Sequence, residues 1–519
     1  MAHRKGRRVR LFFHKIINRI TLTALLLLVQ IGWLFWLFVR LSQYAVWINA
    51  ALTLVSIALA LYIVRREENA GYKMSWLLVL CIAPLFGLFI YLLLGNKRPS
   101  RRLRRRLEAV DQGHPRPVSA ANEQTLDALP PRLRATCRYL EAYAHAPLFA
   151  DTAVRYFPLG DELYSALLAD LEAAQRYIFL EYFIIAEGEM LDGILDVLYR
   201  KAAEGVDVRI IYDDLGCEAA TPLSFVWEAE KHGVRTLAFN PIVPLVSIVM
   251  NHRDHRKIAV IDGKIAYTGG INIADEYINK KERFGHWKDT GVRLEGHAAH
   301  GFAVMFLNLW NGLRPTETDY APYLTPSSHQ VSDEEMPLAV QPYTDSPLDD
   351  ENVAETVYLD ILAQAEHYVY IFTPYLIIDG EMQSALCCAA KRGVDVRIVV
   401  PGIPDKRIAF RLTRSYYGVL MQAGVHIYEY TPGFLHAKSF VADDRVGVVG
   451  SVNLDYRSLY LHFECGVLFV GGRAIAELKR DCLETMSRSH EVVRRELSRP
   501  KRLWHRLLDA ILRAVSPLF

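Results

Sequence analysis

The chain of 519 residues has room for a membrane region followed by two domains of ordinary size. Its net charge of +2 excludes the strong overall basic charge that is typical of nucleic-acid-binding proteins. Its seven scattered cysteines contain no Cys-x-x-Cys pair, which argues against a disulfide framework or a zinc site and indicates reduced thiols facing a cytosol.

Three apolar segments near the N-terminus are each long enough to cross a bilayer. They span residues 20–39, 45–64 and 76–94. Basic runs at 4–10 and 97–106 flank them, and both runs favour the cytoplasmic side. Three complete crossings cannot place both runs there, so either one segment does not cross or one basic run lies on the opposite side. The sequence therefore predicts two or three crossings. Pro84 and Gly87 interrupt the third segment, which makes it the best candidate on physical grounds for one that re-enters without crossing.

The remainder of the chain is predicted to be a duplicated α/β protein. A linker at 107–132 leads to a first lobe at 133–323, and an acidic linker at 324–350 separates it from a second lobe at 351–488. Each lobe repeats the order helix, strand, helix, strand. The strands fall at 177–183 and 205–210, and again at 368–372 and 393–398. This alternation predicts two sheets, each covered by helices.

One constellation occurs twice with identical spacing, once in each lobe. From each His, a Lys follows at +2, an Asp at +7, a pair of small residues at +14 and +15, and an Asn at +17. The copies span 255–272 and 436–453 and consist of His255, Lys257, Asp262, Gly269, Gly270 and Asn272, and of His436, Lys438, Asp443, Gly450, Ser451 and Asn453. Residues i and i+2 of a strand share a face, so each His emerges beside its Lys.

Two His, two Lys and two Asn that face one another would form a cationic pocket for a phosphodiester. The Lys and Asn side chains could hold the non-bridging oxygens, one imidazole could attack phosphorus, and the other could transfer the proton. Because the lysines neutralise the phosphate, this chemistry needs neither a metal nor a cofactor.

These residues resemble the H-x-K-x4-D-x6-G-[GS]-x-N signature of the phospholipase D superfamily. Further matches at 251–254, 285–290, 451–458 and 463–464 are most similar to bacterial cardiolipin synthases, and the resemblance covers about residues 45–490. It implies two phospholipase D-like lobes of duplicated mixed sheets, preceded by an α-helical membrane region at 1–106. In this family the second and third apolar segments resemble the usual helix pair, which would make the first segment the additional one.

The resemblance also implies roles for individual residues. His255 would be the nucleophile and His436 the general acid and base. A downstream carboxylate would orient each imidazole, and Asp289 and Glu464 extend the two copies in this way. His462 departs from the pattern, because Asn is expected at that position.

The function implied is that of a membrane-embedded phosphatidyltransferase acting on anionic phospholipids. With two phosphatidylglycerol molecules it would give cardiolipin and glycerol, at the inner (plasma) membrane, as a multi-pass protein with a cytoplasmic catalytic domain. A phospholipase D-type hydrolase, a transphosphatidylase with another acceptor, and an inactive membrane scaffold are the alternatives. A nuclease is disfavoured, because the apolar segments are present and a strongly basic groove is absent. The sequence fixes neither the acceptor alcohol nor the oligomeric state.

Three other stretches are candidates for contact with lipid, and each has a structural alternative. The apolar residues 241–250 predict either a loop at the membrane or a buried strand. Residues 501–515, within the C-terminal segment 489–519, predict a basic amphipathic helix that lies on an anionic membrane or packs on the body. A basic cluster could bind a headgroup or form a solvated helix face; its members are Lys406, Arg407, Arg411 and Arg414.

Overall fold

The structure is a computed structural model that describes most of the chain. The described residues are 19–42, 46–95, 101–113, 123–241, 252–317, 319–324, 336–349, 351–497 and 503–518. The predicted basic run at 4–10 and the apolar stretch at 241–250, apart from Pro241, lie outside them.

The first lobe is built on a seven-stranded mixed sheet. Its strand order is β1-β8-β6-β5-β2-β3-β4, in which β2, β3 and β4 run parallel and the other neighbours pair antiparallel. The strands are β1 (Thr152–Phe157), β2 (Tyr177–Tyr182), β3 (Asp207–Asp213), β4 (Arg235–Phe239), β5 (Lys257–Ile261), β6 (Ile265–Gly269) and β8 (Gly291–Gly296). Every residue of β2 is buried, which agrees with the apolar run that predicted this strand.

The second lobe repeats this order in an eight-stranded sheet. Its strands follow the order β19-β13-β12-β10-β15-β16-β18-β9, which matches the first sheet strand for strand apart from β19. They are β9 (Ala339–Asp345), β10 (Tyr368–Phe372), β12 (Asp395–Pro401), β13 (His426–Tyr430), β15 (Ser439–Ala442), β16 (Val446–Gly450), β18 (Glu464–Val470) and β19 (Ser489–Glu491). The structure therefore confirms the predicted duplication.

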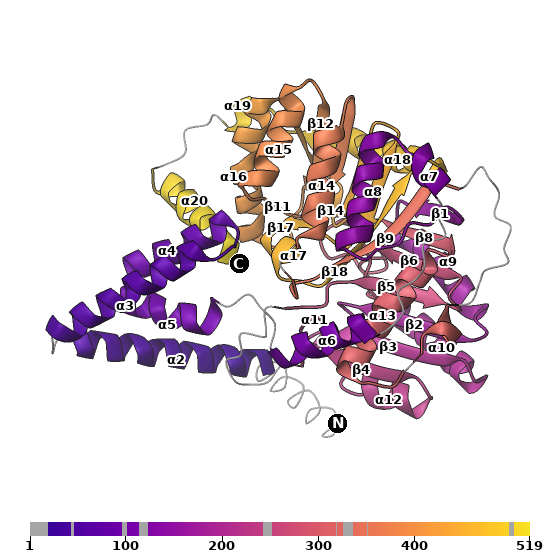
Figure 1. The fold of residues 1–519 in the computed structure, drawn as a ribbon, viewed down its shortest axis with the longest axis horizontal. Coiled ribbons are helices and arrows are strands. Elements are labelled where there is room, and N and C mark those ends of the chain that lie inside the picture. Colours follow the sequence, from indigo (N-terminus) through magenta and orange to yellow (C-terminus); the bar gives the residue numbers. More distant parts are fainter. Residues whose placement is uncertain are drawn as a thin grey trace, which may run out of the picture.

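Helices cover both sheets, and the lobes lie against each other (Figure 1). In the first lobe they are α9 (Gly160–Glu172), α10 (Glu189–Ala203), α11 (Asp214–Cys217), α12 (Phe225–Lys231) and α13 (Ala299–Leu313). Helix α8 (Pro131–Tyr143), which the sequence predicted at the start of the first lobe, packs on the second lobe instead: Leu140 lies in its core, and Thr136 Oγ1 donates to Asp360 at 2.6 Å. In the second they are α14 (Val353–Gln364), α15 (Gly380–Lys391), α16 (Arg407–Ala423), α17 (Tyr456–Tyr460) and α18 (Arg473–Ser487). One apolar core is shared, because Phe179 and Val260 of the first sheet and Phe372 and Val441 of the second belong to the same cluster.

Two predicted linkers contain regular structure. Residues 339–345 of the predicted inter-lobe linker form β9, which pairs along its full length with β18. Pro342 and the surrounding acidic residues concealed this edge strand from sequence analysis. In the predicted 107–132 linker, α6 (Arg101–Gly113) continues to residue 113 and buries Leu107 against Gly312 of α13, and α7 (Glu123–Ala128) follows.

The apolar N-terminal segments form helices α2 (Arg19–Ser42), α3 (Val46–Arg65), α4 (Ala70–Ile82) and α5 (Pro84–Leu94), which project to one side of the lobes (Figure 1). The third predicted segment is divided at Ala83, because Pro84 cannot continue the hydrogen-bond ladder of α4. Within the described residues, no helix combines the length and the hydropathy that crossing a membrane requires. The number of crossings therefore stays a prediction.

The C-terminal helix α20 (Leu503–Val515) packs between α16 and α4. Arg411 of α16 pairs with Asp509 at 2.6 Å, and Ser75 Oγ of α4 donates to the carbonyl of Ala514 at 2.6 Å. The packing alternative is thus correct for one face of this helix. An opposite set of apolar side chains stays exposed and consists of Trp504, Leu507 and Ile511.

Candidate active site

The two copies of the motif meet at the interface between the lobes. His255 and Lys257 stand at the start of β5, and His436 and Lys438 stand just before β15. Both histidines, together with Asn272 and Asn453, line one cavity of about 890 Å³. The structure therefore brings the His and Asn side chains of both copies to a single site.

Each imidazole is held by a carboxylate of the opposite lobe. His255 Nδ1 lies 2.9 and 3.1 Å from the two carboxylate oxygens of Glu464, and His436 Nδ1 lies 2.6 Å from Asp289 Oδ2. We expected Asp289 and Glu464 each to complete its own copy, so this expectation was wrong in its pairing. A carboxylate only accepts hydrogen bonds, so Nδ1 carries the proton and Nε2 is left with its lone pair.

Backbone pairing explains why the partners are exchanged. The His255 N–H donates to the carbonyl of Phe463 at 2.9 Å, and the His436 N–H donates to the carbonyl of Lys288 at 2.7 Å. Phe463 and Lys288 directly precede the two carboxylates. Around the second contact, β7 (His286–Lys288) pairs in parallel with β14 (Gly433–Leu435) across the lobes. These contacts bring each carboxylate to the imidazole of the other lobe.

The small residues at +15 make room for the carboxylates. A Cβ on Gly270 would lie 2.1 Å from Asp289 Oδ1, so any larger residue would displace that carboxylate. Ser451 stands at the equivalent position, and its hydroxyl donates to Glu464 Oε2. One half-site therefore combines Gly with Asp, and the other combines Ser with the longer Glu.

The two asparagines are not equivalent. Asn272 Oδ1 accepts the N–H of Ile184 at 3.0 Å, and its Nδ2 donates to the Tyr277 hydroxyl at 2.7 Å. Asn453 is buried, and its Oδ1 has no hydrogen-bond partner among the described residues. A phosphate-binding role for the two amides stays a prediction. Asn453 is the better candidate, because fewer of its hydrogen-bonding groups are already used.

The two lysines lie buried next to the histidines. Each Nζ donates to the carbonyl of its own motif histidine, and Lys438 Nζ also lies 2.8 Å from His436 Nδ1. Burial lowers the pKa of Lys257 to about 8 and that of Lys438 to about 7. An anion in the cavity would stabilise the charged form of both lysines.

The surroundings of both histidines favour the neutral imidazole. Burial, followed by the charge of the neighbouring lysines, lowers the pKa of His255 well below its ordinary value. Burial and Lys438 lower the pKa of His436 to about 4. A neutral imidazole with a free Nε2 has the form that a nucleophile or general base requires.

The motif aspartates were predicted as catalytic, but they lie at the other end of the strands. Asp262 accepts three backbone N–H groups, from Gln175, Arg176 and Tyr177, at 2.7 to 2.9 Å. Asp443 does the same for Glu366, His367 and Tyr368. Both have positive φ, at 54° and 55°, in the turn after the motif strand. Their predicted catalytic role is therefore corrected to one of fixing the start of β2 and β10.

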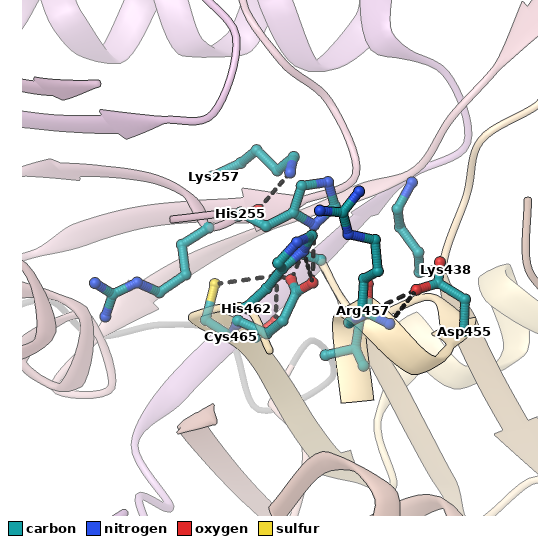
Figure 2. Close-up of polar contacts among 12 residues, drawn as sticks. His255, Lys257, Lys438, Asp455, Arg457, His462 and Cys465 are labelled. Atoms are coloured by element: carbon teal, nitrogen blue, oxygen red, sulfur yellow. Dashed lines mark hydrogen bonds and ion pairs between the residues drawn. The ribbon is translucent and has the colours of Figure 1, made fainter. Parts of the chain in front are cut away.

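Two further aromatic side chains of the cavity contact the motif histidines. His462 packs on His255 with ring centroids 5.6 Å apart, and neither of its ring nitrogens has a hydrogen-bond partner among the described residues. Trp287 packs on His436 at 5.5 Å. His462 and Trp287 each stand two residues before a carboxylate. Arg457 extends alongside the imidazoles of His255 and His462 (Figure 2).

By distance alone, His255, His462 and Glu464 could hold a metal ion, because their ligand atoms lie within 4.8 Å of one another. Lys257 and Arg457 stand close to the same group, since their charges contribute to lowering the pKa values of the two imidazoles. This cationic environment suits an anion better than a metal ion.

The predicted basic cluster divides into two pairs. Lys406 and Arg407 line the cavity, whereas Arg411 pairs with Asp509, and Arg414 pairs with Glu429 at 2.8 Å. Only the first pair is placed to meet a ligand.

Comparison with known proteins identifies both lobes. The family model described as a cardiolipin synthase, phospholipase D-like domain matches residues 167–297 and 358–485, and a phospholipase D-nuclease N-terminal model matches 54–96. The chain is 33% identical to a cardiolipin synthase of Listeria welshimeri, covering 89% of this chain and 96% of the relative. It is 31% identical to a cardiolipin synthase of Halalkalibacterium halodurans, covering 96% and 99%.

Two further proteins are similar to this chain, but neither similarity bears on the reaction. A protein of Streptococcus mutans with no assigned function is 44% identical over 88% of this chain and 99% of its own length. The crystal structure of phosphatidylserine synthase from Haemophilus influenzae matches 74% of this chain and all of its own with a TM-score of 0.56. At 16% identity this match concerns the fold alone.

Replacing the motif aspartates should reduce stability more than chemistry. Asp262→Asn or Asp443→Asn removes a carboxylate that accepts three N–H groups, so each should lower the unfolding free energy by about 2 kcal/mol. Thermal unfolding measures this loss. Asp444→Asn is the control, because Asp444 is exposed and pairs with Lys479 at the surface. A variant of Asp262 with unchanged stability and no activity would contradict this assignment.

The exchanged pairing can be tested on the rings themselves. Glu464→Gln should change the ¹⁵N resonances of the His255 imidazole in the other lobe, and Asp289→Asn those of His436, because an amide no longer fixes the Nδ1–H tautomer. Each variant should also lose activity by at least about a hundredfold. Histidine-labelled protein, with His255→Ala and His436→Ala to assign the signals, provides the measurement. A response confined to the histidine of the same lobe would refute the pairing.

Proposed function

Because the chain belongs to the cardiolipin synthase family of phospholipase D-like proteins, we propose that it transfers a phosphatidyl group between two phosphatidylglycerol molecules. The products are cardiolipin and glycerol. The observation that carries this proposal is the pair of neutral imidazoles, each fixed at Nδ1 by a carboxylate of the opposite lobe and both lining one cavity.

In the first step, His255 Nε2 attacks the phosphorus of one phosphatidylglycerol. A phosphorus–nitrogen bond forms, the bond to the glycerol headgroup breaks, and protonated His436 gives its proton to the departing oxygen. The negative charge of the bound lipid phosphate, together with Asp289, favours that protonated form of His436.

In the second step, a hydroxyl of the other phosphatidylglycerol attacks the phosphohistidine. His436, now neutral, removes the proton from this hydroxyl, and His255 is released as the new ester bond forms. One phosphodiester replaces another, so the exchange requires neither an energy source nor a redox cofactor.

Lys257 and Lys438 stabilise the negative charge on the non-bridging oxygens of the phosphoryl group during both steps. They are buried beside the two imidazoles, where water does not weaken their effect. The amide of Asn453 is the further candidate for holding a non-bridging oxygen.

The walls of the cavity suit a lipid. Its apolar lining includes Phe284, Trp287, Ile377, Ile408, Leu412 and Phe434. Such walls exclude water from the phosphohistidine, which favours transfer to a lipid hydroxyl over hydrolysis.

We also propose that the enzyme works at the cytoplasmic face of the inner membrane, anchored by its N-terminal helices. The apolar character of α2 and α3 supports this placement, as does the exposed face of α20 that carries Trp504, Leu507 and Ile511. Two crossings would place both basic runs on the cytoplasmic side, whereas three would place one of them on the other side.

The reaction and the roles of the histidines can be tested with labelled phosphatidylglycerol in vesicles. Wild-type protein should form cardiolipin and glycerol, and His255→Ala and His436→Ala should each be slower by at least about a thousandfold. A phosphohistidine should accumulate in His436→Ala but not in His255→Ala. His426→Ala is the matched control, because His426 is an exposed residue of β13. Phosphatidic acid as the sole product would indicate a hydrolase, and no product in any lipid mixture would favour a scaffold.

The lowered pKa values of the two lysines predict a loss of activity at alkaline pH. Because burial lowers the pKa of Lys257 to about 8 and that of Lys438 to about 7, both lysines lose their charge before lipid binds as the pH rises through this range. Binding an anionic lipid then requires uptake of protons, so kcat/KM should fall above about pH 7 to 8. In Lys438→Arg the charge persists at high pH, so the decline should begin at a higher pH. A profile that is unchanged in this variant would exclude Lys438 as its origin.

A further inference from the structure

The proposed reaction brings two phosphates to one site, and the catalytic groups account for only one of them. In the proposed reaction, Lys257, Lys438 and the two histidines serve the phosphate that changes partners. The acceptor phosphatidylglycerol carries a second phosphodiester, which is separated from its reacting hydroxyl by the three carbons of glycerol. An enzyme that selects this acceptor would gain from a second group of cations in the same cavity.

The cavity contains an excess of cations outside the catalytic pair. Five arginine and lysine side chains and three carboxylates line it. They are Arg253, Arg283, Lys406, Arg407 and Arg457, and Glu276, Asp405 and Asp455. Arg253 pairs with Asp213 at 3.1 Å and Arg283 with Glu276 at 2.9 Å, so these two cations are already neutralised. Lys406, Arg407 and Arg457 remain beside two carboxylates, Asp405 and Asp455, which leaves one positive charge in excess to balance a ligand.

Arg457 lies beside the two imidazoles, and it is exposed, as are Lys406 and Arg407. Asp455 accepts the backbone N–H groups of Arg457 and Ser458 at 2.9 and 3.0 Å, which fixes the start of α17 beneath the side chain. Within the described part of the chain, the guanidinium forms no ion pair and no hydrogen bond. Its desolvation lowers the pKa of Arg457. Figure 2 shows the side chain extending beside His255 and His462, so its free donors lie next to the reacting centre.

Lys406 and Arg407 supply the outer part of the same group. Both side chains are exposed in the cavity wall, and the nearest carboxylate to Lys406 Nζ is Asp405 at 3.9 Å. The Tyr375 hydroxyl donates to Asp405 at 2.6 Å, which occupies part of its accepting capacity. On the same helix, Arg411 and Arg414 are each paired with a carboxylate at 2.6 and 2.8 Å. Lys406 thus lacks the short carboxylate contact of Arg411 and Arg414, although its Nζ lies 5.0 Å from the centre of the Tyr375 ring.

We propose that Arg457, together with Lys406 and Arg407, binds the phosphate of the acceptor lipid. The inference rests on the proposed phosphatidyl transfer and extends it, because it assigns the choice of acceptor to these three side chains. An alcohol that carries a phosphodiester is held at both ends, with its hydroxyl at His436 and its phosphate at Arg457. Water and free glycerol lack the second anchor, so the site favours transfer to phosphatidylglycerol over hydrolysis.

The test compares two water-soluble acceptors that differ in the phosphate and carry no acyl chain. Labelled phosphatidylglycerol in vesicles is the donor, and glycerol or glycerophosphoglycerol, the deacylated form of phosphatidylglycerol, is the acceptor. The measured quantity is the ratio of kcat/KM for the two acceptors. The wild-type ratio should favour glycerophosphoglycerol by at least about tenfold, the factor of one charge-assisted hydrogen bond.

Arg457→Gln should lower this ratio by about tenfold, and the double variant Lys406→Gln/Arg407→Gln should lower it in the same direction. The double variant changes only exposed side chains, so it tests the site even if Arg457→Gln fails to fold. Arg414→Gln is the matched control on α16, because Arg414 is paired with Glu429, and its ratio should equal that of the wild type.

The outcomes separate this inference from the reaction on which it rests. If the variants lose activity toward both acceptors by the same factor, the cations serve the donor phosphate and the inference is overturned. A wild-type ratio near one would overturn it as well. Under either of these outcomes, the proposed function stands if the wild-type protein still transfers the phosphatidyl group to glycerol and forms cardiolipin. A wild-type protein that forms no product would overturn both.

Discussion

Each motif histidine takes its backbone partner and its side-chain partner from two consecutive residues of the opposite lobe. His255 bonds to the carbonyl of Phe463 and the carboxylate of Glu464, and His436 bonds to the carbonyl of Lys288 and the carboxylate of Asp289. Neither imidazole could keep its orientation if the lobes separated. The interface between the lobes is therefore a condition for the site, and the shared apolar core stabilises that interface.

This arrangement also sets the electrostatics of the site. The packing of the two lobes buries two lysines and two imidazoles within one region. Burial is the largest cause of the lowered pKa of each of these four groups. Without a bound anion these surroundings favour neutral histidines, and the lysines lose their protons close to neutral pH. A phosphodiester supplies the negative charge that restores the lysine charges, so binding and protonation are coupled.

The duplication is symmetric in backbone and asymmetric in chemistry. The two sheets share one strand order, yet one half-site combines Gly270 with Asp289 and the other Ser451 with Glu464. The rings beside the histidines differ too, with His462 next to His255 and Trp287 next to His436. Two imidazoles in different environments can take different roles, which a nucleophile and a general acid require. Ser516, which follows α20, also lines the cavity, so the C-terminal segment contributes to its wall.

The sequence alone determined the duplication, the α/β class, and the motif residues that reach the site, because strand periodicity and repeated spacing are local properties of the chain. The same spacing made Asp262 and Asp443 look catalytic, since a motif does not reveal which of its members point to one end of a strand and which to the other. The strand β9 was missed because Pro342 and flanking acidic residues hid a pattern that pairing with β18 stabilises. Only the tertiary structure decided that the carboxylates are exchanged between lobes and that Lys406, Arg407 and Arg457 line one cavity. These are contacts between segments distant in the chain, and packing two lobes face to face, rather than any local preference, brings them together.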